Sequence, residues 1–359
     1  MFAVLGFGFS ACQREAQAPQ RAESGVTFTV RTVDAPPAKA AIYPEGTLPK
    51  NAGLGLVAYK YETGNAAASA WTVLTKPALT PLILDDAGSG GNRTDGSGKW
   101  IPAPGSRLLW PREGFVRYFG FAPYSAVSGT FTDNQAPVLA YSVPTDVGDQ
   151  VDLLVSTPGS TRQYSGDPSW RNIDVPMDLQ HALTGVRFRL PEGLEIISLN
   201  ISGAYASGSL DLSAPTAWSG QSGSAAYTLT NLSLGNGLRA DSANPGFNIT
   251  DDNGTLILMP QSLPAGATIS VVLSNTRSIT ASIAGFTWPI NTLVTYTITR
   301  RSGLWVLLAE VNNFGNELSD VVVSPVNMTE FESEDGGPLE ISPDGTSESY
   351  QHGVVPDFV

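Results

Sequence analysis

The fold of this chain is most constrained by a series of short β-prone runs that are separated by glycine- and proline-rich turns. Apolar and polar residues alternate at residues 26–30 and 185–190, which is typical of strands with one buried face. The chain contains 37 glycines and 26 prolines, and only 15% of its residues are charged. The runs are not separated by amphipathic helical patterns. The sequence therefore predicts an all-β protein built from β-sandwiches.

Further strands are expected at short intervals along the chain. They cover residues 54–61, 107–110, 115–124, 138–143, 151–156, 196–201, 226–232, 255–258, 268–273, 294–299 and 304–311. Tight hairpin turns are expected at residues 252–254 and 301–303. The glycine-rich stretch 85–99 matches neither the spacing of a phosphate-binding loop nor that of a calcium-binding loop. We interpret it as a long hairpin connection.

The length of 359 residues predicts two domains of ordinary size. A segment rich in Pro, Asp, Ser and Asn near residues 165–180 marks the expected boundary. We assign an N-terminal β-sandwich to residues 26–175 and a C-terminal β-sandwich to residues 176–317. Residues 318–359 are expected to form an acidic C-terminal extension.

The net charge of −13 is concentrated toward the C-terminal end. Residues 1–301 contain all 20 Lys and Arg residues and 22 Asp and Glu, whereas residues 302–359 contain 11 Asp and Glu and no basic residue. The body of the protein is therefore nearly neutral. Because no basic field is available to neutralise phosphates, we expect no nucleic-acid partner.

Cys12 is the single cysteine, and it follows an apolar run at residues 2–11. The string Phe-Ser-Ala-Cys at residues 9–12 resembles the lipobox of bacterial lipoproteins, which predicts lipidation of Cys12. We interpret residues 1–12 as a lipoprotein signal segment. Because no Lys or Arg follows Met1 directly, this segment is expected to be clipped at its start. Residues 13–25 then form a polar leash.

The sequence does not suggest catalytic chemistry. Its two histidines, His181 and His352, lie far apart, and the Cys and His residues do not form a metal-binding motif. His181 adjoins an expected core strand and is interpreted as structural. We therefore expect no enzyme activity, no metal and no cofactor.

Several segments in a fixed order resemble the fimbrillin family of Bacteroidales. They are Trp-Pro at 110–111, YFGFAPY at 118–124, QVDLLVS at 150–156, LQHALTGVRF at 179–188 and LMPQ at 258–261. The resemblance implies two tandem transthyretin-like β-sandwich domains. It also implies export as a palmitoylated lipoprotein to the outer membrane, and a role as a fimbrial subunit in cell adhesion and biofilm formation.

The family resemblance further implies assembly by donor-strand exchange with other fimbrial subunits, triggered by an Arg-specific protease. The leaving strand would then contain Val26, Phe28 and Val30, with cleavage after Arg31 in an exposed link. Arg21 is the competing cleavage site. Shaft, anchor and tip subunits are not distinguished.

A donor strand is expected in the short β-prone run Val321, Val322, Val323 and Val326. Pro325 limits its pairing, and the acidic segment continues beyond it. The alternative is an ordinary edge strand of the second domain.

A competing function is a surface lipoprotein that binds a glycan or a host protein without polymerising. Trp71, Trp100 and Trp110 are the candidate stacking platforms. Trp100 is expected to be the most exposed because it adjoins the glycine-rich loop, and Trp110 is expected to pack in the core. An exported β-sandwich hydrolase is a third hypothesis, which requires carboxylates that converge in a cleft.

Overall fold

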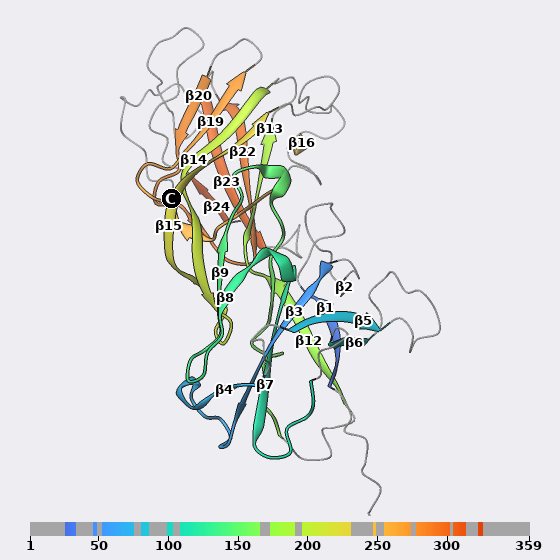
Figure 1. Cartoon of the computed structure of the whole chain (residues 1–359). Helices are drawn as coiled ribbons and strands as arrows, with labels where there is room; N and C mark the ends of the chain where they lie inside the picture. Colours follow the sequence, from blue (N-terminus) through green and yellow to red (C-terminus); the bar gives the residue numbers. More distant parts are fainter. Residues whose placement is uncertain are drawn as a thin grey trace, which may run out of the picture.

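The computed structural model describes residues 26–33, 46–48, 52–74, 80–85, 99–102, 108–165, 173–190, 196–230, 247–248, 255–273, 278–301, 304–313 and 322–325. These residues form strands that are joined by turns and short 3-10 helices (Figure 1). The all-β expectation is therefore confirmed. In the described part of the chain, no helix has the length and apolar character needed to cross a membrane.

The first sheet contains ten strands from the N-terminal half of the chain. They are β1 (Thr27–Thr32), β2 (Gly46–Thr47), β3 (Leu54–Tyr61), β4 (Thr72–Val73), β5 (Thr80–Asp85), β6 (Lys99–Pro102), β7 (Phe115–Ala122), β10 (Leu154–Ser156), β11 (Tyr164–Ser165) and β12 (Asp174–His181). The main pairing path runs β7-β10-β12-β1-β6-β5-β3, and β3 also pairs with β7. The pairing of these strands therefore closes into a ring.

Two further six-stranded sheets form the other group of strands. One sheet contains β13 (Thr184–Leu190), β16 (Phe247–Asn248), β17 (Leu256–Leu258), β22 (Thr292–Arg301), β23 (Leu304–Asn313) and β24 (Val322–Pro325). The other contains β8 (Ser128–Thr130), β9 (Val138–Ser142), β14 (Ile196–Asp211), β15 (Trp218–Thr230), β19 (Thr268–Leu273) and β20 (Ser278–Ser282). A small ribbon pairs β18 (Gln261–Ser262) with β21 (Thr287–Trp288), and the 3-10 helices are η2 (Ala68–Ala70), η4 (Tyr124–Ala126) and η5 (Val147–Asp149).

Strand pairing does not follow the expected boundary between residues 175 and 176. The strand β12 crosses that position and pairs with β1 and β10, so it belongs to the first sheet. The strands β8 and β9 come from the N-terminal half but join the sheet of β14. Figure 1 shows β8 and β9 beside β14 and β15. One edge of β14 pairs with β19 near its start and with β9 near its end, because 16 residues are long enough for both.

Two hydrophobic cores are separated by the strands β3 and β7. Alternate residues of β3 enter different cores, as the period of two in a strand requires. Leu54, Leu56 and Ala58 belong to a small core inside the closed first sheet. Val57 and Tyr59 belong to a large core that continues between the other two sheets. Because both faces of β3 and β7 are buried, the two halves of the molecule share these strands.

Most expected strands are present, but several bounds differ. Residues 54–61 and 268–273 form strands with the expected bounds. The run at 107–110 forms no extended strand in its described residues, where only Leu109 makes a β-bridge. The strand β14 continues ten residues beyond 201, because its Ser- and Gly-rich second half is held by pairing on both edges.

The two expected hairpin connections that can be compared are confirmed by the pairing of their flanking strands. Asp85 pairs with Lys99 across the glycine-rich stretch, and Arg301 pairs with Leu304. The expected turn at 252–254 lies outside the described residues.

Gly55→Ala is expected to destabilise the fold, because a Cβ at this position would clash with the ring of Phe121. Overpacking of this kind lowers the free energy of unfolding by about 1–3 kcal/mol. Gly266→Ala is the matched control, since its Cβ would have no heavy atom within 4 Å. Urea unfolding followed by tryptophan fluorescence measures both. Equal stability of the two variants would contradict the two-sided burial of β3.

Candidate functional site

The structure brings most of the predicted site residues in the N-terminal half together around β1. Val26, Phe28, Val30 and Arg31 lie on or beside this strand, and Trp100 of β6 pairs with it. Four predicted residues lie outside the described part of the chain. These residues are Cys12, Arg21, Val321 and Val326.

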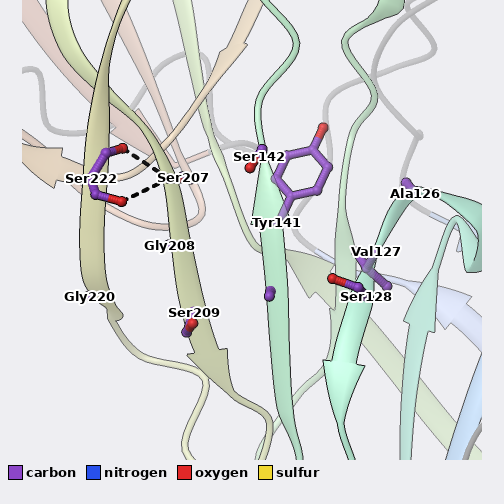
Figure 2. A pocket seen from close by; sticks show the side chains of 11 residues that line it. Ala126, Val127, Ser128, Tyr141, Ser142, Ser207, Gly208, Ser209, Gly220 and Ser222 are labelled. Carbon is purple, nitrogen blue, oxygen red and sulfur yellow. Dashed lines mark hydrogen bonds between the residues drawn. The ribbon is translucent and has the colours of Figure 1, made fainter.

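A second feature, which the sequence did not reveal, is an open hollow of about 580 Å³ on β8, β9, β14 and β15 (Figure 2). Serine hydroxyls line much of it, and the Ser207 hydroxyl donates to the Ser222 carbonyl oxygen at 3.0 Å. Its lining contains no charged side chain. Small polar residues that alternate along β14 were the only signal in the sequence, and they carry no specific chemistry.

The strand β1 lies in the middle of the first sheet, and its two edges are paired to different extents. It runs parallel to β12 and pairs with it along its whole length, from Thr27 opposite Asp174 to Thr32 opposite Leu179. Among the described residues, its other edge pairs with β6 at Phe28 and Trp100 and with β2 at Arg31 and Thr32. The strand therefore closes the ring of the first sheet at its weakest pairing.

The inward face of β1 fills part of the small core. Val26, Phe28 and Val30 are 1%, 0% and 4% exposed. The Phe28 ring meets the Tyr118 ring edge to face at 5.2 Å, and Tyr118 contacts Trp110 in the same way at 6.1 Å. Burial of these three side chains contributes about 1.5–3 kcal/mol each to the stability of the closed sheet.

The polar atoms around Phe28 do not add hydrogen bonds to this packing. Among the described residues, no hydrogen-bond partner contacts the buried indole N–H groups of Trp100 and Trp110 or the buried Tyr118 hydroxyl. Burial raises the pKa of Tyr118, and nearby Tyr164 raises it further, so the phenol stays neutral. The aromatic wall behind β1 is therefore held by apolar contacts.

The expectation that Trp100 is exposed is wrong. Trp100 is 1% exposed and belongs to the small core. Its neighbour Lys99 is exposed, and because side chains alternate along a strand, Trp100 of β6 points inward. Trp71 and Trp110 are buried as well, and the core position expected for Trp110 is confirmed. Trp100 is thus unsuited to stack on a glycan in this structure.

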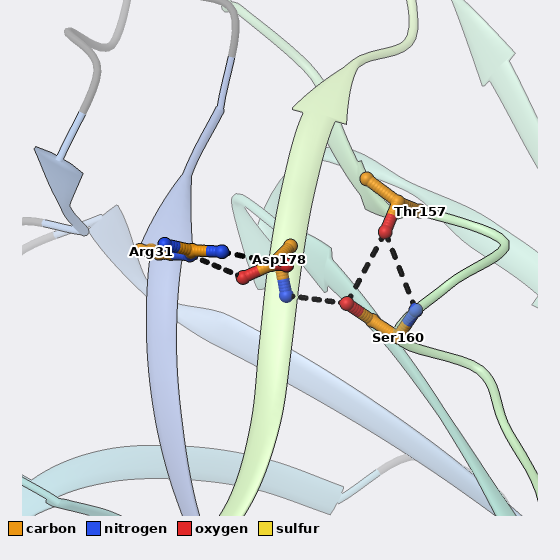
Figure 3. Close-up of polar contacts among 4 residues, drawn as sticks. All are labelled: Arg31, Thr157, Ser160 and Asp178. Atoms are coloured by element: carbon orange, nitrogen blue, oxygen red, sulfur yellow. Dashed lines mark hydrogen bonds and ion pairs between the residues drawn. The ribbon is translucent and has the colours of Figure 1, made fainter.

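The expectation that Arg31 lies in a link after the strand is also wrong. Arg31 lies within β1, paired with Asp178 on β12 and with Thr47 on β2. Its side chain is 65% exposed and holds Asp178 through both carboxylate oxygens, at 2.5 and 3.1 Å (Figure 3). The guanidinium is thus accessible, but the peptide bond that follows it lies in the sheet.

The backbone of Asp178 is held by a second set of contacts on the far side of β12. Its N–H donates to the Ser160 hydroxyl at 2.6 Å, and that hydroxyl accepts from Thr157 at 3.2 Å (Figure 3). The Ser160 hydroxyl thus fixes Asp178 in position to meet Arg31.

The other end of β1 is held by a second carboxylate on β12. The Thr27 hydroxyl donates to Asp174, and the Lys99 ammonium lies 3.0 Å from the same carboxylate. Burial opposes ionisation of Asp174, but the Thr27 hydrogen bond and Lys99 outweigh it and lower its pKa. The outward face of β1 is therefore polar at both ends, whereas its inward face is apolar.

The strand β24, within the predicted donor run, pairs antiparallel with β23 at the edge of its sheet. Val322 lies opposite Val311 and Pro325 opposite Leu308. This is the arrangement expected of an ordinary edge strand. The donor role is not tested by this pairing and stays a prediction.

His181 is a buried structural residue, as expected from its sequence context. Its Nδ1 lies 2.8 Å from an Asp152 carboxylate oxygen, and the two side chains are 0% and 1% exposed. The pair ties β12 to the segment before β10. Among the described residues, no group of three His, Cys, Asp or Glu side chains is arranged to hold a metal ion.

Comparison with known proteins identifies the class of this all-β chain. A family model described as fimbrillin-like matches residues 45–313. A fimbrial protein from Bacteroides vulgatus has a similar structure, with 16% identity, a TM-score of 0.52, and coverage of 80% of this chain and 99% of the other. A candidate cell-adhesion protein from Bacteroides ovatus gives 14% identity, a TM-score of 0.50, and coverage of 83% and 100%. No curated protein gives a significant match.

The family match covers most of the chain, so the chain belongs to the fimbrillin-like family. It is a fimbrial or adhesin-like protein of the cell surface, and its family indicates interaction with other fimbrial subunits. The family resemblance inferred from sequence motifs is confirmed.

Phe28→Ala is expected to destabilise the protein by about 3–5 kcal/mol, because it leaves a cavity against Tyr118 that the aromatic wall cannot close. The control is Thr29→Ala on the exposed face of the same strand, which should change the stability by less than about 0.5 kcal/mol. Urea unfolding measures both variants. A small effect of Phe28→Ala would show that β1 contributes little to the small core.

A fall in pH should weaken the contacts that the Asp174 carboxylate makes with Thr27 of β1 and with Lys99. Because the folded-state pKa of Asp174 is lowered, its stabilising effect is present above the ordinary pKa of 3.8 and is lost as the pH falls through the folded value. Asp174→Asn should therefore be less stable than the wild type at pH 6, by up to about 1 kcal/mol, and the difference should vanish near pH 2. Urea midpoints across this range test it, and a difference that is independent of pH would contradict it.

Proposed function

We propose that this protein is a structural subunit of a surface fimbria, exported as a lipoprotein and assembled by protease-triggered donor-strand exchange. In this proposal the protein has no catalytic role. It supports adhesion and biofilm formation through the filament, and lipid on Cys12 holds the precursor at the outer membrane. The proposal is carried by one observation. The strand β1 fills the small core, yet it closes the first sheet through a single residue pair with β6.

Removal of β1 would open the β12 edge and uncover the aromatic wall behind Phe28. An open strand edge beside an apolar surface accepts an extended segment of another chain through backbone hydrogen bonds, while alternate side chains of that segment pack against the apolar surface. The unequal edges of β1 support this route, because among the described residues one edge has six residue pairs with β12, whereas the other has one pair with β6 and two with β2.

The two candidate cleavage sites have different consequences. A cut after Arg21 would sever the lipid anchor but leave β1 attached to its own chain. A cut after Arg31 would free β1 from the body. Since Arg31 is paired on both sides, the protease needs the end of β1 to open before it acts. We therefore propose Arg31 as the site that couples release from the membrane to polymerisation.

Ligand binding without polymerisation loses its main support, because Trp100 is buried.

Treatment of the purified protein with an Arg-specific protease is expected to give a cut after Arg31 and, when other fimbrial subunits are present, a ladder of oligomers on a gel. Arg31→Lys keeps the cation beside Asp178 but removes the cleavage site, so it should abolish both. Arg21→Lys is the control and should leave the ladder intact. Mass spectrometry locates the cut. A clean cut after Arg31 without oligomers, both in the purified protein and after addition of other fimbrial subunits, would count against a polymerising subunit.

A further inference from the structure

We infer that the seat of β1 selects a partner strand with an aromatic residue at the position of Phe28 and a cation at the position of Arg31. We define the β1 seat as Trp100, Tyr118, Asp174, Met177 and Asp178. The inference rests on the proposed function and names the kind of partner strand. The strand that fits is an extended segment of a different subunit, because residues 321–326 of this chain lack both features and residues 302–359 lack the cation.

The aromatic requirement comes from the depth of the seat at Phe28. This side chain is completely buried, and its ring packs edge to face on Tyr118. Behind Tyr118 lie the rings of Trp110 and Tyr164, at 6.1 and 5.9 Å. A short aliphatic side chain at this position would leave a cavity that these packed rings cannot collapse to fill.

The cation requirement comes from a difference between the two carboxylates of the seat. Asp174 is contacted by Lys99 on β6, so it keeps a cation when β1 leaves. Asp178 is paired with Arg31 of β1 itself, and within the described residues no cation from another strand contacts its carboxylate. Its backbone is fixed by Ser160. The departure of β1 therefore leaves a fixed negative charge at one end of the seat.

The number of positions between the aromatic residue and the cation of the partner strand is the same in either direction of that strand. Phe28 faces inward and Arg31 outward, so residues an odd number of positions apart must serve the two roles. A strand with an apolar–x–aromatic–x–apolar–cation pattern meets them in the direction of β1. A strand in the opposite direction meets them with the same spacing reversed.

The chain's own C-terminal segment lacks both features in its predicted donor run. Residues 321–326 contain neither an aromatic nor a basic residue, and residues 302–359 contain 11 Asp and Glu with no Lys or Arg. A strand formed by residues 321–326 would leave the space of Phe28 empty, and no strand from residues 302–359 could offer a Lys or Arg to Asp178. The seat thus favours mixed assembly over a homopolymer.

Peptide binding to the cleaved protein tests the inference. Full-length protein is cut with the Arg-specific protease, the protease is inhibited, and labelled peptides are added. The reference peptide has the sequence of residues 26–32 with Lys in place of Arg31. A peptide that also carries Phe28→Ala should bind at least about 10-fold more weakly, and a peptide with Arg31→Glu instead should bind about 2- to 5-fold more weakly. The 321–326 peptide should bind more weakly than the reference.

Charge reversal supplies the control. In Asp178→Lys protein, the preference should invert, so that the peptide with Glu at position 31 binds better than the peptide with Lys. Equal binding of these two peptides to the wild type, or tight binding of the 321–326 peptide, would overturn the inference. Failure of every peptide to bind after a confirmed cut would count against the proposed function instead.

A second measurement does not require β1 to leave. In the uncut full-length protein, Arg31→Glu should raise the hydrogen-exchange rate of the β1 amides about 2- to 5-fold, because two carboxylates then face each other. The Arg31→Glu, Asp178→Lys double variant should restore the slow exchange. Exchange that is unchanged in Arg31→Glu would overturn the role of Asp178 even if no strand is ever exchanged.

Discussion

The first half of this protein depends on the parallel pairing of β1 with β12. That pairing places the side chains of Val26, Phe28 and Val30 against an aromatic wall. The ring of paired strands is then completed where Phe28 of β1 pairs with Trp100 of β6. The hydrophobic gain is large, but among the described residues the edge of β1 that faces β6 and β2 has fewer residue pairs than the edge that faces β12. The strand thus contributes strongly to stability while one of its edges is paired less extensively than the other, which is the physical basis for treating it as replaceable.

The two halves of the molecule are joined by shared strands and by specific polar contacts. The strands β3 and β7 bury one face in each core, so neither half can lose them without exposing apolar surface. The Trp218 indole N–H donates to the Ala182 carbonyl oxygen at 2.6 Å, and the Ile257 N–H donates to the Gln150 side chain at 2.8 Å. Exchange of β1 would therefore occur on a body that remains braced on its other side.

The strands of clear alternation were predictable from sequence, because a period of two with β-branched residues directly reflects one buried face. Prediction failed where pairing, and not composition, decides the structure. The second half of β14 is rich in Ser and Gly and shows little apolar pattern, yet it is a strand because β9 and β15 flank it. Trp100 was expected at the surface because its loop neighbours are polar, whereas the short strand β6 turns it inward.

By itself, the sequence determined the fold class, the family, the acidic C-terminal segment and the apolar face of the first strand, since these follow from periodicity, motif order and charge. The tertiary structure alone decided which strands became neighbours. It placed Arg31 inside β1 beside Asp178, joined β12 to the first sheet and set Lys99 against Asp174. These partners lie far apart in the chain, and their meeting is fixed by the closure of the sheet around a common core, which no local pattern encodes.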